Sequence, residues 1–199
     1  MLTFAPGRQV VAEFSVPDAN GDNVAGLTWT LRLFKDGAEV TSGTEFDSLS
    51  IDGIGSPPTG YAMSFTPITD GSTYMVRGKS SQGDVWEERL EPQTLVAEGA
   101  PSYDQRSAYF RLGSRLVSDG KLVNCTSATA VLYRSDDQTT PVKNLGSGTE
   151  GALNTFTWGA SGVTITGGRN YVARITFTIA SVGSPAAAVT VVRDLSFLA

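Results

Sequence analysis

The chain has 199 residues and a mass of 21.0 kDa, with 15 basic and 20 acidic side chains that give a formal net charge of −5. It contains one cysteine and no histidine, which excludes Ser-His-Asp and Cys-His catalytic sites, histidine-ligated metals, a CxxC motif and an intrachain disulfide. No basic and apolar leader precedes the first polar residues, and no apolar run approaches the roughly 20 residues that cross a bilayer. We therefore expect no membrane partner, no secretion by a signal peptide, and a free thiol at Cys125.

Alternating apolar residues, interrupted by Gly, Asp, Asn, Ser and Pro, predict antiparallel strands throughout the first half. A strand is predicted over 27–33 and is followed by a tight Asp-Gly turn at 36–37. Further strands are predicted over 61–65, 74–76 and 85–90. On the strands predicted over 27–33 and 61–65, the residues expected to face inward are Leu27, Trp29, Leu31, Leu33, Tyr61, Met63 and Phe65.

The second half repeats this pattern at an offset of about 100 positions. Asp36 aligns with Asp136 at an offset of 100, and the turn before Tyr74 aligns with the turn before Tyr171 at an offset of 97. Residues 97–101 contain Gly and Pro, which we expect to interrupt any strand and to form the boundary between two domains. The predicted domains are therefore 1–98 and 99–199.

The two predicted domains differ in charge. Residues 1–98 hold 14 acidic and 6 basic side chains, a net charge of −8, whereas residues 99–199 hold 6 acidic and 9 basic ones, a net charge of +3. Arg106, Arg111 and Arg115 lie close together in the second half. We predict that they form a basic strip that docks the second domain on an acidic protein surface. Nucleic acid is not expected as a partner, because the basic excess is small and no aromatic and arginine platform is visible.

Tyr74 and Tyr171 each follow a turn and open a strand, which resembles the tyrosine corner of immunoglobulin-like and fibronectin type III sandwiches. In that motif the ring packs in the core and the hydroxyl binds the backbone of the preceding loop. The resemblance implies an all-β protein made of two tandem immunoglobulin-like antiparallel β-sandwich domains. It leaves open whether each domain has the strand order of an immunoglobulin domain or that of a fibronectin type III domain.

Three motifs that resemble functional sites are interpreted as structural. Residues 146–151 match GxGxxG, but a predicted strand and not a helix follows them. Residues 18–22 have oxygens at calcium-like spacing without the Gly and Glu of an EF-hand; we expect a turn, with a weak calcium site as the alternative. Glu87 and Glu88 are adjacent, so they point to opposite faces of a strand and cannot flank one glycosidic bond. The sequence therefore predicts no catalytic, cofactor-binding or metal-binding residue, and no enzyme.

Two further segments carry structural expectations. Residues 56–60, Ser-Pro-Pro-Thr-Gly, are predicted to cross between the two sheets, because the prolines stiffen the backbone. Residues 186–192 form an apolar strand, which we place either in the core or at a contact with another subunit.

The profile of the chain resembles the accessory proteins of tailed-bacteriophage virions, which often carry tandem immunoglobulin-like domains. Residues 61–67 followed by 71–76 are similar to the late-strand pattern of those domains, Gly-x-Tyr and then Gly-x-x-Tyr-x-Val. The resemblance implies a non-enzymatic structural protein of the virion, made in the host cytoplasm, that binds other virion proteins and is homo-oligomeric in the assembly. The first expectation is a capsid decoration or cement protein. The alternatives are a tail, baseplate or fibre-adaptor component, and a carbohydrate-binding or adhesin module with Trp86 and Trp158 as an exposed platform.

Overall fold

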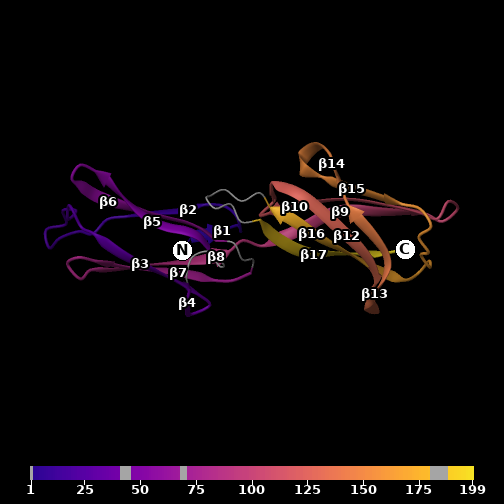
Figure 1. Cartoon of the computed structure of the whole chain (residues 1–199), viewed down its shortest axis with the longest axis horizontal. Coiled ribbons are helices and arrows are strands. Elements are labelled where there is room, and N and C mark those ends of the chain that lie inside the picture. The colour runs from indigo at the N-terminus through magenta and orange to yellow at the C-terminus, as the bar shows by residue number, and fades with distance from the viewer. Residues whose placement is uncertain (1, 41–45, 68–70, 180–187) are drawn as a thin grey trace. The chain divides into compact units, whose positions relative to one another are not determined.

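The computed structural model of the chain describes residues 2–40, 46–67, 71–179 and 188–199. They divide into a first unit that includes Met1–Gln93 and a second unit of Thr94–Ala180 and Thr190–Ala199. Each unit contains two β-sheets (Figure 1). The chain is all-β and consists of two tandem immunoglobulin-like β-sandwich domains, as the sequence predicted.

The first domain has a five-stranded sheet in the order β1-β8-β7-β3-β4 and a three-stranded sheet in the order β2-β6-β5. Its strands are β1 (Leu2–Phe4), β2 (Val10–Phe14), β3 (Trp29–Lys35), β4 (Ala38–Val40), β5 (Phe46–Gly55), β6 (Pro58–Pro67), β7 (Tyr74–Ser80) and β8 (Val85–Pro92). The β1–β8 pair is parallel, and the other described pairs of this domain are antiparallel. The first strand of the domain therefore lies along the edge of the last one.

The alternation of the sequence sets the core of the first domain. Of the residues predicted to face inward, five are buried and two, Trp29 and Leu31, are half-buried, so the prediction is confirmed. The turn predicted at 36–37 joins β3 to β4, and its Asp36 and Gly37 have φ values of 47° and 87°. Two positive φ angles are what a two-residue hairpin turn requires, and Asp-Gly adopts them at low cost.

The second domain has one sheet in the order β13-β12-β16-β17. In the other sheet β10 pairs with β9, β11 and β15, and β15 also pairs with β14. The elements are β9 (Leu95–Asp104), β10 (Tyr109–Ser118), β11 (Lys121–Leu122), β12 (Cys125–Arg134), β13 (Asp137–Ser147), β14 (Thr149–Glu150), the 3₁₀ turn η1 (Ala152–Asn154), β15 (Phe156–Ala160), β16 (Asn170–Ile179) and β17 (Val189–Leu198). The large side chains of its core are fully buried and come from both sheets: Phe110, Leu112, Leu116, Leu132, Phe156, Tyr171 and Phe177.

The predicted domain boundary needs a correction. The division falls between Gln93 and Thr94, and residues 97–101, which we expected to interrupt any strand, lie inside the continuous strand β9. Every residue of β9 pairs with β10. Gly99 and Pro101 are tolerated there because β9 lies at the edge of its sheet, where a proline nitrogen does not remove a hydrogen bond from the ladder.

Residues 56–60 also differ from expectation. They do not cross between sheets: residues 56 and 57 form the turn of a hairpin and residues 58–60 begin β6, because β5 and β6 pair in the same sheet up to Ile54↔Gly60 and Gly55↔Pro58. The stiffness of the prolines serves a tight reversal here, with Gly55 at a φ of 95°. Residues 186 and 187 of the predicted apolar strand lie outside the described residues. From Val189 onward the segment is β17, the last strand of its sheet.

The internal repeat is visible in the strand register. The ladders place Lys35 opposite Tyr74 and Arg134 opposite Tyr171, which makes the offset between β3 and β12 99 positions. The alignment at an offset of 100 is therefore wrong by one residue. Aligning Asp36 with Asp136 shifted the two strands by one residue, because the turn after Lys35 begins with Asp, whereas the turn after Arg134 has Ser first and Asp second.

Candidate docking surfaces

Both predicted tyrosine corners lie in the cores. Tyr171 is 1% exposed, and its hydroxyl oxygen accepts a hydrogen bond of 2.8 Å from the backbone N–H of Thr166, five residues upstream. Tyr74 is fully buried, with its ring edge-on to Phe4 at 5.3 Å and to Phe65 at 5.8 Å. Each tyrosine thus anchors the start of its strand in the sandwich. These contacts position two inner strands, β7 and β16; they do not form a reactive site.

The three arginines of the predicted basic strip do not form one uninterrupted patch. Arg111 and Arg115 point outward from β10, whereas Arg106 lies in the turn between β9 and β10. The guanidinium of Arg115 donates to Glu98 on β9 at 2.9 and 3.1 Å. Arg111 lies over the ring of Tyr109, 5.2 Å from its centroid. The surface therefore presents cations that already have partners on the same sheet.

A second carboxylate lies beside the same arginines. Asp104 accepts hydrogen bonds from the hydroxyl of Ser107 at 2.6 Å and from the backbone N–H of Arg106 at 3.0 Å. These bonds, and to a lesser degree the nearby charge of Arg111, hold the pKa of Asp104 below its ordinary value. Glu98 and Asp104 thus place negative charge between the three arginines, and docking through this strip stays a prediction.

The two tryptophans proposed as a glycan platform face the interior of their domains. The ring of Trp86 stacks on Phe14, with centroids 4.1 Å apart and planes 9° from parallel. Trp158 is 4% exposed, and its indole N–H donates to the carbonyl of Gly146 at 3.0 Å. A carbohydrate platform needs exposed ring faces, so this expectation is wrong. The alternation of strand positions places both rings on the inward side.

The remaining motifs have local structural roles. The Asp18 carboxylate accepts backbone N–H groups of Asn20 at 2.8 Å and Asp22 at 3.0 Å, and these bonds lower its pKa. Residues 146–151 lie in strands and the turn between them, with no long helix after them. Among the residues that the structure describes, no group of three or more His, Cys, Asp or Glu side chains is placed to hold a metal ion. The oxygens at 18–22 therefore stabilise a turn.

The outer faces of the two domains repeat one arrangement that sequence reasoning missed. In the first domain Arg77 on β7 lies over the ring of Phe34, 5.5 Å from its centroid, and pairs with Glu87 on β8. In the second domain Arg174 on β16 lies 5.3 Å from the ring centroid of Tyr133 and donates two bonds of 2.9 Å to Asp194 on β17. The signal was an arginine three residues after each corner tyrosine. Both faces are thereby charged but locally compensated.

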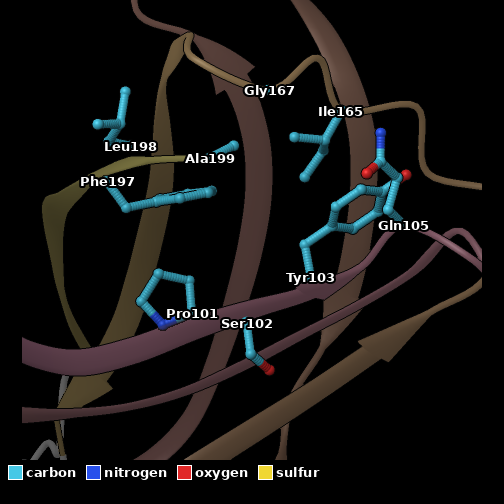
Figure 2. Close-up of a pocket in the computed structure, with 9 residues that line it drawn as sticks. All are labelled: Pro101, Ser102, Tyr103, Gln105, Ile165, Gly167, Phe197, Leu198 and Ala199. Atoms are coloured by element: carbon cyan, nitrogen blue, oxygen red, sulfur yellow. The ribbon is translucent and has the colours of Figure 1, made fainter.

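The second domain has an apolar hollow of about 300 Å³ between the far ends of β9 and β17 and the loop before β16. Figure 2 shows Pro101, Tyr103, Ile165 and Phe197 around it, with Ser102 pointing away. The Tyr103 hydroxyl donates to the Val163 carbonyl at 2.8 Å, which fixes one wall. Such a hollow suits one or two apolar side chains and offers no charged side chain to a ligand.

The opposite wall of the hollow is equally well fixed. Phe197 stacks between Phe110, at 5.7 Å, and Tyr171, at 5.8 Å. Its ring is therefore part of the aromatic packing of the core on one side and lines the hollow on the other. The hollow is therefore bounded by a strand end that packs on the core, and not by a loop alone.

A scan of family models and a search of curated proteins give no match to this sequence. Solved structures with a similar arrangement include domains of titin, at 9% identity and a TM-score of 0.29, over 99% of this chain and 61% of that one. The adhesin FdeC of Escherichia coli matches at 11% identity and a TM-score of 0.32, over 96% of this chain and 61% of that one. The adhesin InvE of Yersinia pseudotuberculosis matches at 13% identity and a TM-score of 0.34, over 98% of this chain and 56% of that one.

The chain thus spans about three fifths of the length of these structures. Likenesses at such scores carry no argument about function, and the fold assignment rests on the strand order and pairing given above. In the described part of the chain, no helix has the length and apolar character needed to cross a membrane.

Proposed function

We propose that this chain is a non-enzymatic structural protein that works by binding other proteins through its sheet edges. The observation that supports this most is β17, a ten-residue strand at the end of its sheet, next to an apolar hollow of about 300 Å³. A sheet edge offers backbone N–H and C=O groups that can pair with a strand of another chain. An edge beside an apolar hollow adds a place for a side chain and so provides specificity.

The setting that we propose is the virion of a tailed bacteriophage, with synthesis in the host cytoplasm. The pattern of residues 61–67 and 71–76 and the tandem small sandwiches support it. We propose first a capsid decoration or cement protein that docks through its second domain and is homo-oligomeric in the assembly. Many copies on a repetitive shell make individually weak contacts strong in sum. A tail, baseplate or fibre-adaptor component would use the same contacts at another location.

An adhesin remains the second candidate, now as a protein-binding and not a carbohydrate-binding module. The same β17 edge supports it, because strand addition does not depend on the partner's setting. The buried position of Trp158 and the stacking of the half-buried Trp86 on Phe14 argue against the glycan platform on which the carbohydrate-binding form depended.

Quantitative mass spectrometry of purified virus particles from the source of this sequence tests the proposed setting. A decoration protein is expected at a copy number proportional to that of the major capsid protein, whereas a tail component is expected at a few copies per particle. Absence of the chain from intact particles, together with its presence on the cell surface, would contradict the virion role and favour the adhesin.

A further inference from the structure

The first domain shows what can cover the edge of a last strand. Its own β1 lies parallel to β8, with Leu2↔Leu90, Thr3↔Glu91 and Phe4↔Pro92 as partners. The Phe4 side chain is 2% exposed, and its ring lies 5.3 Å from that of Tyr74. A three-residue extended segment therefore closes this edge and adds one aromatic side chain to the core.

The matching place in the second domain can be found from the register. Tyr74 pairs with Leu90 on β8. In the second domain the N–H of Ala199 donates to the carbonyl of Arg169 at 3.1 Å, and counting back along this antiparallel pair places Phe197 opposite Tyr171. Residues 197–199 thus correspond to residues 90–92, beside which β1 lies.

The second domain uses its first strand differently. Its β9 pairs with β10 over its whole length and does not cover β17. Among the described residues no strand pairs with the outer edge of β17. The hollow of about 300 Å³ lies at this place, and 197–199 form one of its walls (Figure 2). The hollow of the second domain therefore borders the residues that correspond to those that β1 lies beside in the first domain.

We infer that residues 197–199 and the adjoining hollow bind an extended apolar segment of a partner protein, which adds as a parallel strand and inserts one apolar side chain. The backbone of Ala199 bonds to residues 168 and 169, so the N–H and C=O of the preceding residue, Leu198, point away from β16 toward the added strand. The lining side chains carry no charge, so a charged partner residue buried there would lose its hydration without gaining a compensating charge.

A second copy of this chain fits the edge less well. In a self-paired dimer the two β17 strands would align over most of their length, but the carbonyl of Val192 already accepts a bond of 2.7 Å from the guanidinium of Arg193. The same guanidinium donates to the carbonyl of Leu95 at 2.6 Å and bridges β17 to β9. The bridge blocks the middle of the edge and leaves its last residues, a length that matches the three residues of β1.

The inference rests on the proposed function only in assigning a protein partner, and its test does not need that partner. The probe is a synthetic peptide with residues 1–8 of this chain, Met-Leu-Thr-Phe-Ala-Pro-Gly-Arg, because its Leu-Thr-Phe segment covers the matching edge in the first domain. Amide chemical shifts of the full chain are followed by NMR as the peptide is added. We expect shifts at 165–167 and 197–199, and loss of binding by at least tenfold for the peptide in which Phe4→Asp places a charge in the hollow.

A matched pair of glycine variants separates the hollow from the rest of the domain. Gly167 lines the hollow, and a Cβ there meets no heavy atom within 4 Å, so Gly167→Leu adds a bulky side chain at the wall of the hollow without a clash at its Cβ. Gly113→Leu is the control, because its Cβ would meet only ordinary contacts of 4.0 Å to Thr155 and Thr157 on the outer face of β10. We expect G167L to weaken peptide binding at least tenfold and G113L to leave it unchanged.

No shifts at millimolar peptide, shifts confined to Leu90 and its neighbours, equal binding by G167L, or a dimer formed through β17 without peptide would each overturn the inference. None of these results bears on whether the chain is found in particles. Absence from particles, in turn, would leave a binding edge that serves another assembly.

Discussion

The two domains place their first strands on different sheets. In the first domain β1 covers the end of β8, so β2 is left as the last strand of the smaller sheet. In the second domain β9 covers β10, and β17 is left as the last strand of the other sheet. The first strand has three residues in the first domain and ten in the second. The sheet that this strand joins thus decides which edge of an otherwise similar sandwich is available for pairing.

The two remaining edges are unequal. The strand β2 has five residues, and Val11 and Glu13 are its exposed side chains. A charged side chain on a short edge strand discourages pairing with other chains. The strand β17 has ten residues and ends beside an apolar hollow. Under the proposed function, this difference implies that docking depends on strand placement more than on the net charge of a domain.

The substitution with the largest expected effect removes the cover of the first edge. Phe4→Ala deletes a side chain that is 2% exposed against Tyr74, and we expect a loss of about 3–5 kcal/mol in the free energy of unfolding of the first domain. Urea unfolding is read from tryptophan fluorescence, with Trp29 and Trp86 reporting this domain. Thr3→Ala, at an exposed position of the same strand, is the control.

The transition of the second domain, reported by Trp158, should not move in either variant. A loss below about 1 kcal/mol for F4A, within the range of surface substitutions, would mean that β1 is not an integral part of the first sandwich.

The anchoring of β16 in the second domain is tested by Tyr171→Phe. The substitution removes the hydroxyl that accepts the N–H of Thr166 at 2.8 Å and keeps the buried ring. We expect the second domain to lose about 1 kcal/mol, the usual net value of one hydrogen bond. Tyr133→Phe, on the outer face under Arg174, should lose much less. Equal losses in the two variants would contradict a structural role of the Tyr171 hydroxyl.

The single thiol distinguishes the second domain chemically. Cys125 is 2% exposed, and burial, with a smaller contribution from the charge of Glu150, raises its pKa to about 12. Because the thiolate is the nucleophile, we expect Ellman's reagent at pH 8 to react with the native chain at least roughly 100-fold more slowly than with the chain in urea. Fast labelling of the native chain would show that the core opens near the start of β12.

The sign of the pH dependence follows from the same shift. The folded state holds the thiol protonated to a higher pH than the unfolded state does. Its contribution to stability is therefore fully present below the unfolded pKa, near 9, and is lost as the pH rises toward 12. Comparison with Cys125→Ser over this range isolates the thiol from other groups that titrate there.

The smallest expected effects come from the repeated outer faces. Arg77→Ala and Arg174→Ala each break one exposed ion pair and one contact with an aromatic ring. Exposed pairs contribute about 0.2–1 kcal/mol, so each domain should lose a similar small amount, and the double variant should show the sum. A loss of unfolding free energy several times larger in one domain than in the other would contradict the equivalence of the two outer faces.

The sequence was sufficient for the parts of the fold that depend on local pattern. The alternation over 27–33 and 61–65, the Asp-Gly turn at 36–37 and the two corner tyrosines all predicted strands that the structure contains. Local pattern did not determine which sheet each first strand joins. Residues 97–101 read as a break, yet pairing with β10 makes them strand, because tertiary partners override weak local propensity.

The hollow, the proposed docking site, was harder to predict for the same reason. The hollow combines Pro101, Ile165 and Phe197 from three segments, and no spacing in the sequence links them. The arginines that did cluster in the sequence are separated in space by Glu98 and Asp104. The segment 186–192 was recognised as apolar, but the position of β17, which begins at Val189, at the edge of a sheet follows only from the strand order.

Residue-resolved hydrogen exchange on the monomeric full chain tests the difference between the two edges most directly. In the first domain the N–H of Gln93 donates to the carbonyl of Phe4 at 2.8 Å, so we predict slow exchange there and at Glu91. In the second domain we predict that the amides of Ser196 and Leu198 exchange near the rate of an unprotected chain. Protection of Ser196 and Leu198 equal to that of Gln93, in a sample shown to be monomeric, would contradict an uncovered edge on β17 and the docking role built on it.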